Sequence, residues 1–185
     1  MSKIIIRGCL EDPNPIQLGL IGEIHEVLTA RSIPHWLGGG WALDFLLGEC
    51  LRVHSDIDWA IWKTDAPTVS TCLEALGYIR KELRHPEEHI GFYKLDQFVS
   101  FGLLEKTQSG DIVTSGRWTD WPYPQGAFSA PEGRLGDLTC PILSAEAQLD
   151  EKVNFHKHPA GAPLRDVDFP AIEKLREYIA DQQRK

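Results

Sequence analysis

One 25-residue segment constrains the fold more than any other part of the chain. It reads GGGWALDFLLGECLRVHSDIDWAIW, from Gly38 to Trp62, and combines a glycine turn with two aspartates in an apolar run. Side chains of a strand alternate between its faces, so Asp56 and Asp58 point to the same side, roughly 6–7 Å apart along the chain. Two neighbouring carboxylates repel each other, and burying them is costly unless a cation lies between them. The pair therefore predicts a metal site at this strand.

The surrounding residues indicate which ligand the metal accompanies. Mg²⁺ prefers oxygen ligands and is commonly bound by one or two carboxylates together with substrate phosphates. Gly39 and Gly40 leave a short strand and lead into a helix, where a turn without side chains lets phosphates approach the free N–H groups of the helix N-terminus. Arg52 and His54 can reach phosphate oxygens if their loop folds back. We expect Mg²⁺ and a nucleoside triphosphate to share this site.

The individual motifs also have ordinary interpretations. A single D-x-D is commonly a surface pair or a turn cap, and paired glycines occur in many turns. The combination of strand, glycine turn, helix and a D-x-D strand about 15 residues later is much more specific than either motif alone. We therefore interpret the segment as a functional site.

Composition limits the class of protein. A chain of 185 residues with 42% hydrophobic and 25% charged residues can form one packed domain. Its net charge of -8, with no Lys/Arg cluster, argues against nucleic acid as a partner and fits a cationic small molecule or a metal-bound nucleotide. Four widely spaced cysteines favour a reducing cytoplasm, and the apolar run near the N-terminus is too short for a signal peptide or membrane span. We expect a cytoplasmic protein that does not bind membranes; the sequence does not indicate its oligomeric state.

The hydrophobic pattern predicts an α+β fold, with a mixed sheet flanked by helices and a short C-terminal helical part. We expect strands at 33–37, 56–62, 78–83, 90–95 and 97–104, with a return strand near 112, and helices at 16–31, 41–48, 65–76, 144–156 and from Asp168 as N-cap onward. Residues 117–139 are rich in glycine, proline and aromatic residues and are predicted as a loop. We divide the chain into a core of residues 1–139 and a C-terminal helical part of residues 140–185, packed on it as one compact unit.

Three segments carry a family resemblance. GGGWALD (Gly38–Asp44), RVHSDID (Arg52–Asp58) and, more faintly, CPILSAEAQL (Cys140–Leu149) resemble small-molecule antibiotic nucleotidyltransferases. This group contains the aminoglycoside 2''-adenylyltransferases and lincosamide nucleotidyltransferases, within the DNA polymerase β-like nucleotidyltransferase superfamily. The resemblance implies Mg²⁺-dependent transfer of a nucleoside monophosphate from a nucleoside triphosphate to a hydroxyl of a small molecule, with release of pyrophosphate.

The resemblance also implies residue roles. Asp56 and Asp58 correspond to the catalytic metal ligands, and Gly39 and Gly40 to the turn that holds the β- and γ-phosphates. The nucleotide-binding residues Arg52 and His54 border the same site. Asp44 matches an acid beside the glycine turn in the family and is a candidate substrate contact; a solvated helix position explains it nearly as well.

One family feature is missing from the sequence. The family has a third carboxylate on a later strand, and its position here falls on Ser100, which cannot carry the charge or act as a base near neutral pH. Glu105 lies on the opposite parity and needs a bulge, which Gly102 permits. Ser100 and Glu105 are retained as candidate substrate contacts. Two hypotheses stay open: an active nucleotidyltransferase for an aminoglycoside- or lincosamide-like acceptor, with its base unidentified, and a catalytically weakened nucleotide-binding or regulatory protein.

Overall fold

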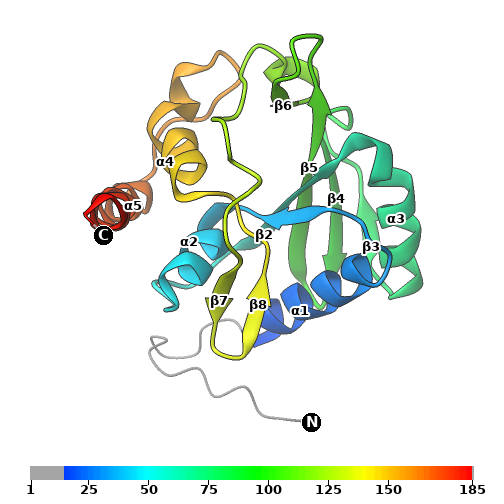
Figure 1. Ribbon diagram of the computed structural model, residues 1–185. Coiled ribbons are helices and arrows are strands. Elements are labelled where there is room, and N and C mark those ends of the chain that lie inside the picture. The colour runs from blue at the N-terminus through cyan, green and yellow to red at the C-terminus, as the bar shows by residue number, and fades with distance from the viewer. Residues whose placement is uncertain (1–14, 185) are drawn as a thin grey trace.

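The computed structural model describes residues 15–184, in which a mixed sheet is flanked by helices (Figure 1). The helices are α1 (Pro15–Thr29), α2 (Gly39–Leu47), α3 (Ala66–Ala75), α4 (Ala145–Asn154) and α5 (Asp168–Gln183), with short 3-10 turns at Lys63–Asp65, Gly116–Trp118 and Phe155–Lys157. The strands are β1 (His35–Leu37), β2 (Asp56–Trp62), β3 (Ile79–Lys81), β4 (His89–Lys94), β5 (Gln97–Lys106), β6 (Ile112–Thr114), β7 (Gly133–Leu135) and β8 (Leu138–Cys140). This architecture confirms the predicted α+β class.

The strand with the two aspartates, β2, is an interior strand of the sheet, between β1 and β5. The strand order is β1-β2-β5-β4-β3, with β6 paired to the end of β5. Strands β2 and β5 run parallel, whereas the other pairs are antiparallel. In the parallel pair Asp58 lies opposite Ser100, so the position of the missing carboxylate is directly beside the second aspartate.

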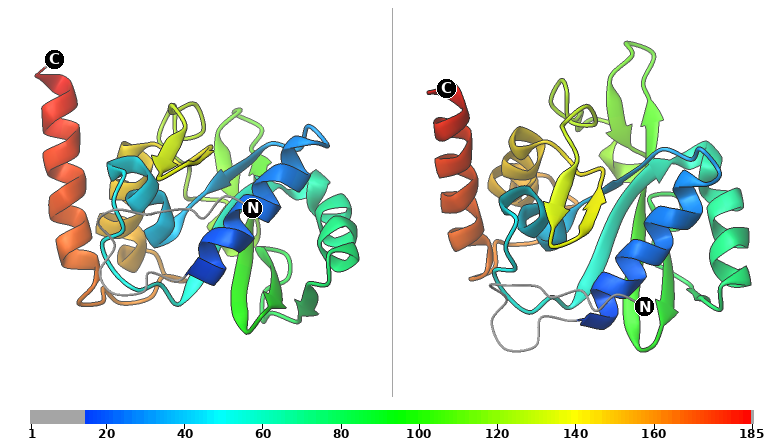
Figure 2. Two further views of the ribbon diagram at one scale, coloured as in Figure 1. Left: turned by 90° about the horizontal axis from the view of Figure 1, so that it is seen from below. Right: turned by 60° about the horizontal axis from the view of Figure 1, so that its bottom comes forward.

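The main core forms between α1 and the sheet. Leu20, Ile21, Ile24 and Leu28 are buried along one face of α1, as the helical spacing predicts, and pack with Ile57 and other apolar side chains of the sheet. Helix α1 lies across the strands and α3 beside it (Figures 1 and 2). The apolar residues of β2 thus face the core and leave its aspartates on the other side.

A smaller cluster attaches the C-terminal helices. Leu43 of α2, Ala145 of α4 and Leu175 of α5 are buried together, and α5 lies at the outer edge of the molecule (Figure 2). The backbone adds a second attachment, because Leu37 N donates to Pro141 O over 2.8 Å and Leu143 N donates to Leu37 O over 3.1 Å. The proposed division at residue 139 stays a prediction; these bonds join the segment after residue 139 to β1 in the part before it.

Most predicted elements are confirmed, and β2 has the predicted bounds. The prediction of a loop over residues 117–139 is wrong in part, because β7 and β8 form an antiparallel hairpin. Each of these strands has three residues, which is too short to show a period in the sequence. Asp168 is the first residue of α5 rather than its N-cap, and Val167 occupies the cap position.

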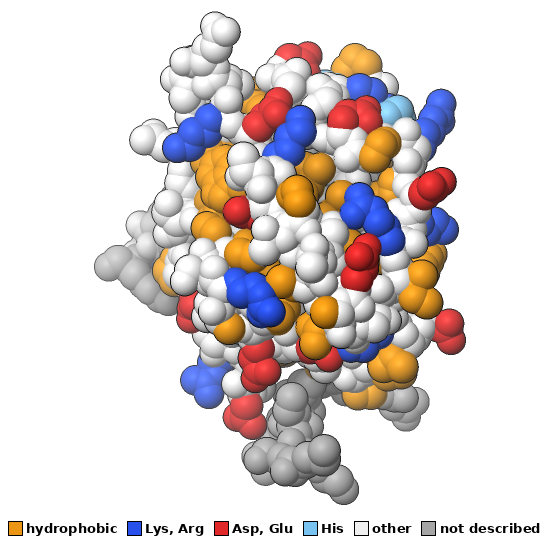
Figure 3. Space-filling view, turned by 90° about the vertical axis from the view of Figure 1, so that its right-hand side faces the viewer, with side chains coloured by type: hydrophobic (Ala, Val, Ile, Leu, Met, Phe, Trp, Pro, Cys, Tyr) orange, Lys and Arg blue, Asp and Glu red, His pale blue; other side chains and the backbone are white. Residues whose placement is uncertain are grey.

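The surface view shows mixed charge on the face that carries α3. Lys and Arg side chains are interspersed with Asp and Glu side chains there, and apolar groups lie between them (Figure 3). Within residues 15–184, no helix has the length and apolar character needed to cross a membrane. A cavity beside α2 and α4 lies away from this face.

Candidate active site

A cavity of about 390 Å³ lies where β2 and β5 meet the start of α2 and the side of α4. Its polar lining comes from both ends of the chain. The residues that line it include Gly39, Asp58, Ser100, Glu151, Lys152 and Arg165. Residues separated by more than 100 positions in the sequence therefore form one site.

The glycine turn is fitted against the second aspartate. Gly38 N donates to Asp58 O over 2.8 Å, and Gly39 has a φ of 60°, in the left-handed region that favours glycine. A Cβ at Gly39 would lie 2.5 Å from Asp58 Oδ2, which is closer than atoms can approach. Glycine is required here because the carboxylate occupies the space of a side chain.

The two aspartates project together from β2, while Ile57 and Trp59 between and after them are buried in the core. Burial raises the pKa of Asp58, and the charge of Asp56 raises it further. The hydroxyl of Ser100 donates to Asp58 Oδ1 over 2.8 Å and partly offsets this rise. Asp56 does not line the cavity, but its charge still acts on the pKa of Asp58. Adjacent carboxylate oxygens of this kind fit a hard divalent cation such as Mg²⁺.

The predicted folding back of the loop before β2 is present. A Cβ at Gly40 would lie 2.5 Å from Arg52 Nη2 and 2.6 Å from His54 Nδ1, so both side chains pack against the first turn of α2. His54 Nε2 and Asp44 Oδ2 are 2.7 Å apart, and both residues are buried. The His54 ring also packs on Trp41 at 4.1 Å between centroids. Asp44 is therefore not a solvated helix residue, and it orients His54 from the inside of the protein.

Glu105 is placed elsewhere, which corrects its selection as a candidate substrate contact. Strand β5 pairs with β2 without a bulge from Phe98 to Leu104, so Gly102 does not change the parity. Glu105 does not line the cavity, and its carboxylate contacts Lys63 Nζ over 3.2 Å at the exposed end of the strand. Because β5 is unbroken, the side chain of Glu105 points to the other face of the sheet from that of Ser100, and it lies roughly 16 Å further along the strand.

Several charged residues of the site were not selected as site residues from the sequence. Lys152 and Glu151 come from α4, Arg165 from the loop before α5, and Asp168 is the first residue of α5. Arg165 Nη2 and Nε lie 3.1 and 3.2 Å from the oxygens of Asp168, and Lys152 Nζ lies 3.8 Å from Asp168 Oδ1. Burial opposes ionisation of Asp168, but these basic groups outweigh it and lower its pKa. Only the folded arrangement of α4 and α5 shows that these residues face β2.

A smaller hollow of about 100 Å³ adjoins the cavity. Trp118 stacks on Phe155 with 4.7 Å between ring centroids and on His158 with 4.3 Å, and Trp118 and Phe155 line this hollow. The two spaces share the residues His89, Thr114, Tyr123, Glu151 and Phe155. The hollow is thus an aromatic extension of the cavity beside α4.

A buried acid fixes this aromatic extension. Glu88 accepts hydrogen bonds from Arg117 Nε over 2.6 Å, from Arg117 Nη2 over 2.9 Å and from Trp118 Nε1 over 3.2 Å. These bonds, with Arg117 first, lower the pKa of Glu88 to about 2 despite its burial. The position of Trp118 therefore depends on an ionised carboxylate behind it.

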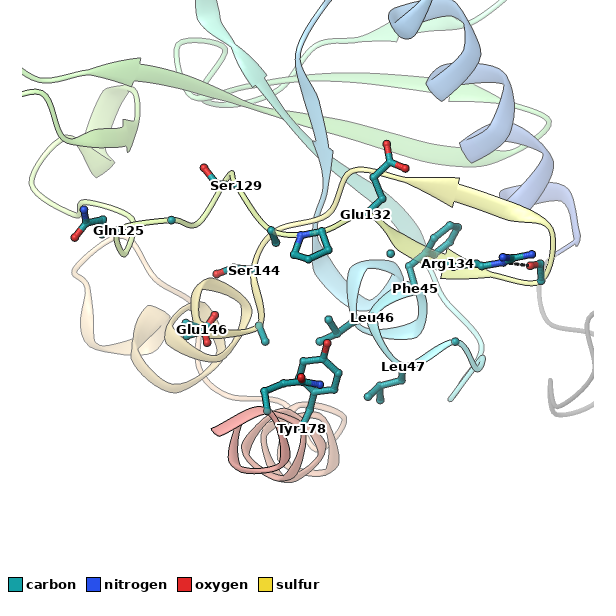
Figure 4. A pocket seen from close by; sticks show the side chains of 18 residues that line it. Phe45, Leu46, Leu47, Gln125, Ser129, Glu132, Arg134, Ser144, Glu146 and Tyr178 are labelled. Atoms are coloured by element: carbon teal, nitrogen blue, oxygen red, sulfur yellow. Dashed lines mark hydrogen bonds between the residues drawn. The ribbon is translucent and has the colours of Figure 1, made fainter. Parts of the chain in front are cut away.

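A separate groove of about 1020 Å³ lies on the other side of α4 (Figure 4). It runs between α2, the segment 125–136 and α5, with Phe45, Leu46, Glu146 and Tyr178 in its wall (Figure 4). None of the residues predicted for metal or nucleotide binding lines it. Its size alone does not make it the active site, because Gly39, Asp58 and Ser100 line the smaller cavity instead.

Comparison with known proteins identifies the family. The profile of the family "Aminoglycoside-2''-adenylyltransferase" matches residues 20–175. The chain belongs to this family. A 2''-aminoglycoside nucleotidyltransferase of Klebsiella pneumoniae is 53% identical over 165 residues, covering 86% of this chain and 73% of the relative. A lincosamide resistance protein of Staphylococcus haemolyticus is 27% identical over 163 residues, covering 83% and 90% of the two chains.

Solved structures support the fold of this family member. The crystal structure of ANT(2'')-Ia in complex with adenylyl-2''-tobramycin has a TM-score of 0.72 and 19% identity, covering 91% of this chain and 92% of that one. At this identity the likeness shows the polymerase β-like nucleotidyltransferase fold alone. Together with the family match, it confirms the sequence prediction of a nucleotidyltransferase, an enzyme whose substrate is a nucleoside triphosphate.

Proposed function

We propose that this enzyme transfers an adenylyl group from ATP to a hydroxyl of an aminoglycoside and releases pyrophosphate. The contact between the Gly39 turn and the Asp58 carboxylate carries this proposal, because it brings a phosphate-binding turn and a metal-binding acid to one point. The related 2''-aminoglycoside nucleotidyltransferase and the adenylyl-2''-tobramycin bound to ANT(2'')-Ia support the choice of acceptor and nucleotide.

The triphosphate is assigned to the first turn of α2. The free N–H groups of Gly39 and Gly40 and the positive end of the helix dipole favour anionic oxygens there. Arg52 and His54 pack against the same turn and supply positive charge or hydrogen-bond donors. Lys152 reaches the cavity from α4, across from β2, and adds a further cation.

Asp56 and Asp58 are assigned as the ligands of Mg²⁺. The bound ion would neutralise phosphate charge and polarise the transferred phosphoryl group. The raised pKa of Asp58, caused by burial and by Asp56, supports this role, because a cation at this point relieves both effects. The protein contributes the fixed position of the two carboxylates on an interior strand.

The acceptor is assigned to the side of the cavity that continues into the aromatic hollow. Aminoglycosides are polycations, and a chain with a net charge of -8 attracts them over long range. Tyr123, Phe155 and the acid Glu151 border this side, and aromatic faces together with carboxylates suit a cationic sugar ring. A lincosamide acceptor is the alternative within the same reaction, supported by the lincosamide resistance protein.

A nucleotide-binding protein without turnover is the second candidate. Ser100 favours it, because a hydroxyl stands beside Asp58 where the family resemblance implies a carboxylate. Such a protein would bind Mg²⁺ and ATP through the same turn and aspartates. It would release no pyrophosphate when an acceptor is added.

The test measures pyrophosphate release with ATP, Mg²⁺ and either tobramycin or lincomycin. We expect release with tobramycin and a loss of at least about 10²-fold in Asp56→Asn, because a charge that stabilises the transition state is removed. Asp137→Asn, an exposed residue in the β7–β8 turn, is the matched control and should behave as wild type. An unchanged rate in Asp56→Asn refutes the metal site. ATP binding in calorimetry without release by the wild type supports the second candidate.

A further inference from the structure

We propose that Glu151 accepts the proton of the acceptor hydroxyl, in the role that the family resemblance gives to a carboxylate at the position of Ser100. The inference rests on the proposed transferase function and names a further catalytic residue for it. The sequence did not point to Glu151, because it lies 51 residues beyond Ser100 on a helix, whereas the expected acid lies on a strand.

Helix α4 holds Glu151 in a defined position. The Ser144 side chain caps the helix by accepting from Ala147 N over 3.2 Å, and Gln148 Nε2 donates to Leu143 O over 2.8 Å. Glu151 follows Gln148 by three residues and therefore lies on the same face of the helix. That face is bonded through Leu143 to the end of β1, so the carboxylate has a fixed place relative to the sheet.

Glu151 stands at the junction of the two spaces of the site. It lines the cavity that contains Asp58 and Ser100, and it also lines the aromatic hollow that contains Trp118. A base for this reaction must lie within hydrogen-bond reach of the acceptor hydroxyl, close to the phosphoryl group on the side of the aspartates. The junction meets this requirement.

The other acids of the cavity have competing partners. Among the described residues that line it, the carboxylates are those of Asp58, Glu151 and Asp168. Asp58 is assigned to the metal, and Asp168 accepts two hydrogen bonds from the Arg165 guanidinium. Glu151 is the acid left to take a proton.

The environment of Glu151 gives its carboxyl group a pKa that suits a general base. Burial raises the pKa of Glu151 to about 7, and the charges of Asp58 and Asp150 add to the rise. The positive charge of Lys152 and a hydrogen bond with Tyr123 oppose it. A base with a pKa near the working pH is ionised in a substantial fraction of molecules and still binds a proton well. His89, His156, Arg165 and Asp168 are the other titratable groups that line the cavity.

The proposed step balances as follows. The acceptor oxygen forms a bond to the α-phosphorus of ATP, and its proton moves to a carboxylate oxygen of Glu151. The bond from the α-phosphorus to the oxygen bridging the α- and β-phosphates breaks, and pyrophosphate leaves with that electron pair. Glu151 then releases the proton to solvent, so one proton appears for each adenylyl group transferred.

The experiment compares Glu151→Gln with Glu146→Gln in single-turnover measurements with saturating ATP, Mg²⁺ and tobramycin. Glutamine keeps the size of the side chain but cannot take the proton, so we expect a fall of about 10²–10⁴-fold in rate. ATP affinity, measured by calorimetry, should change by less than about threefold. Glu146 lies on the same helix but faces the separate groove, so its variant should keep the wild-type rate (Figure 4). A fall in Glu151→Gln below about tenfold overturns the proposal.

The pH dependence provides a readout that a structural role would not give. The wild-type single-turnover rate should rise as the pH passes through about 7, where Glu151 loses its proton, and should level off above it. The inflection should persist in His89→Gln, a variant of the histidine that shares the junction, and should disappear in Glu151→Gln. A wild-type profile that is flat from about pH 6 to 8 overturns the proposal even if Glu151→Gln does not fold.

The two proposals fail in different ways. If the wild-type enzyme releases no pyrophosphate with tobramycin or lincomycin, the proposed function fails and the assignment of Glu151 falls with it. If the wild type is active and Glu151→Gln matches it, only the assignment of Glu151 is refuted. The control at Glu146 shows whether loss of a negative charge on α4 alone lowers the rate.

Discussion

The two sides of the cavity are built in different ways. The side that we assign to the triphosphate comes from residues 38–58, and its parts touch through backbone and short side chains, as at Gly39 and Asp58. The side that we assign to the acceptor is assembled from Tyr123, Glu151 and Arg165, which belong to a loop, a helix and a second loop. The first side depends on close steric fit, whereas the second depends on charged hydrogen bonds and aromatic stacking.

This difference separates two properties of the enzyme. Nucleotide binding should tolerate changes on the acceptor side, because the α2 turn and β2 are held by the sheet and the main core. Acceptor binding should be sensitive to the anchors of α4 and of the Trp118 segment, which lie outside that core. Three substitutions test this separation, from the largest expected effect to the smallest.

Gly39→Ala tests the steric side. A Cβ would lie 2.5 Å from Asp58 Oδ2, and a non-glycine residue at φ 60° costs roughly 1–2 kcal/mol in addition. We expect kcat/KM to fall by about 10²–10³-fold, since the displaced carboxylate is assigned to the metal. Steady-state kinetics with varied ATP measure the effect.

Gly77→Ala is its matched control. Gly77 also has a positive φ, of 84°, but open space where a Cβ would lie. This variant should lose about 1 kcal/mol of stability and keep its kcat/KM. Equal losses of activity in both variants would contradict the steric explanation.

Glu88→Gln tests the acceptor side. It removes the charge that holds Arg117 and Trp118, so we expect the free energy of unfolding to fall by about 2 kcal/mol. The KM for tobramycin should rise while the KM for ATP stays unchanged. Denaturant unfolding and steady-state kinetics measure both effects, with the exposed neighbour Glu87→Gln as control. A matching rise in the KM for ATP would contradict the separation of the two sides.

The effect of Glu88→Gln on the free energy of unfolding should depend on pH. The pKa of Glu88 is about 2 in the folded protein and lies below its ordinary value of 4.5. Its contribution to stability is therefore complete above pH 4.5 and is lost as the pH falls from 4.5 towards 2. The difference in unfolding free energy between wild type and Glu88→Gln should shrink over this interval, and a constant difference would refute the ionised pair.

Ser100→Ala is expected to have the smallest effect. It removes the hydroxyl that donates to Asp58 Oδ1 over 2.8 Å, a hydrogen bond worth about 1 kcal/mol. We expect kcat to fall about threefold to tenfold with Mg²⁺ and ATP, because Asp58 keeps its charge and its place against Gly39. A loss above about 10²-fold would make Ser100 itself part of the chemistry and weaken the assignment of Glu151.

The sequence predicts the geometry of the glycine turn and the two aspartates well, because these residues are close together in the chain. The parity of β2 brings Asp56 and Asp58 to one face, and the glycines between β1 and α2 place the turn beside them. The resemblance of Gly38–Asp44 and Arg52–Asp58 to the family also leads to the right family. The metal- and nucleotide-binding roles of these residues stay predictions until the variants are measured.

The charged residues on the side assigned to the acceptor were not predictable, because their contacts are distant in sequence. Helical spacing marks one apolar face of α4 but does not show that Glu151 and Lys152 face β2. Glu105 was selected by its distance along β5, and the continuous pairing of β2 with β5 excludes it from the cavity. The β7–β8 hairpin escaped prediction because pairing between two three-residue strands is set by their tertiary surroundings.

The backbone bonds of Leu37 to Pro141 and Leu143 have a consequence for how the protein can be shortened. Strand β1 is the last strand on its side of the sheet, and these bonds cover its outer edge. A fragment ending before residue 140 would expose that edge, with its unpaired N–H and C=O groups open to other chains. The segment around residues 141–143 therefore also hinders self-association of the enzyme through the β1 edge of its sheet.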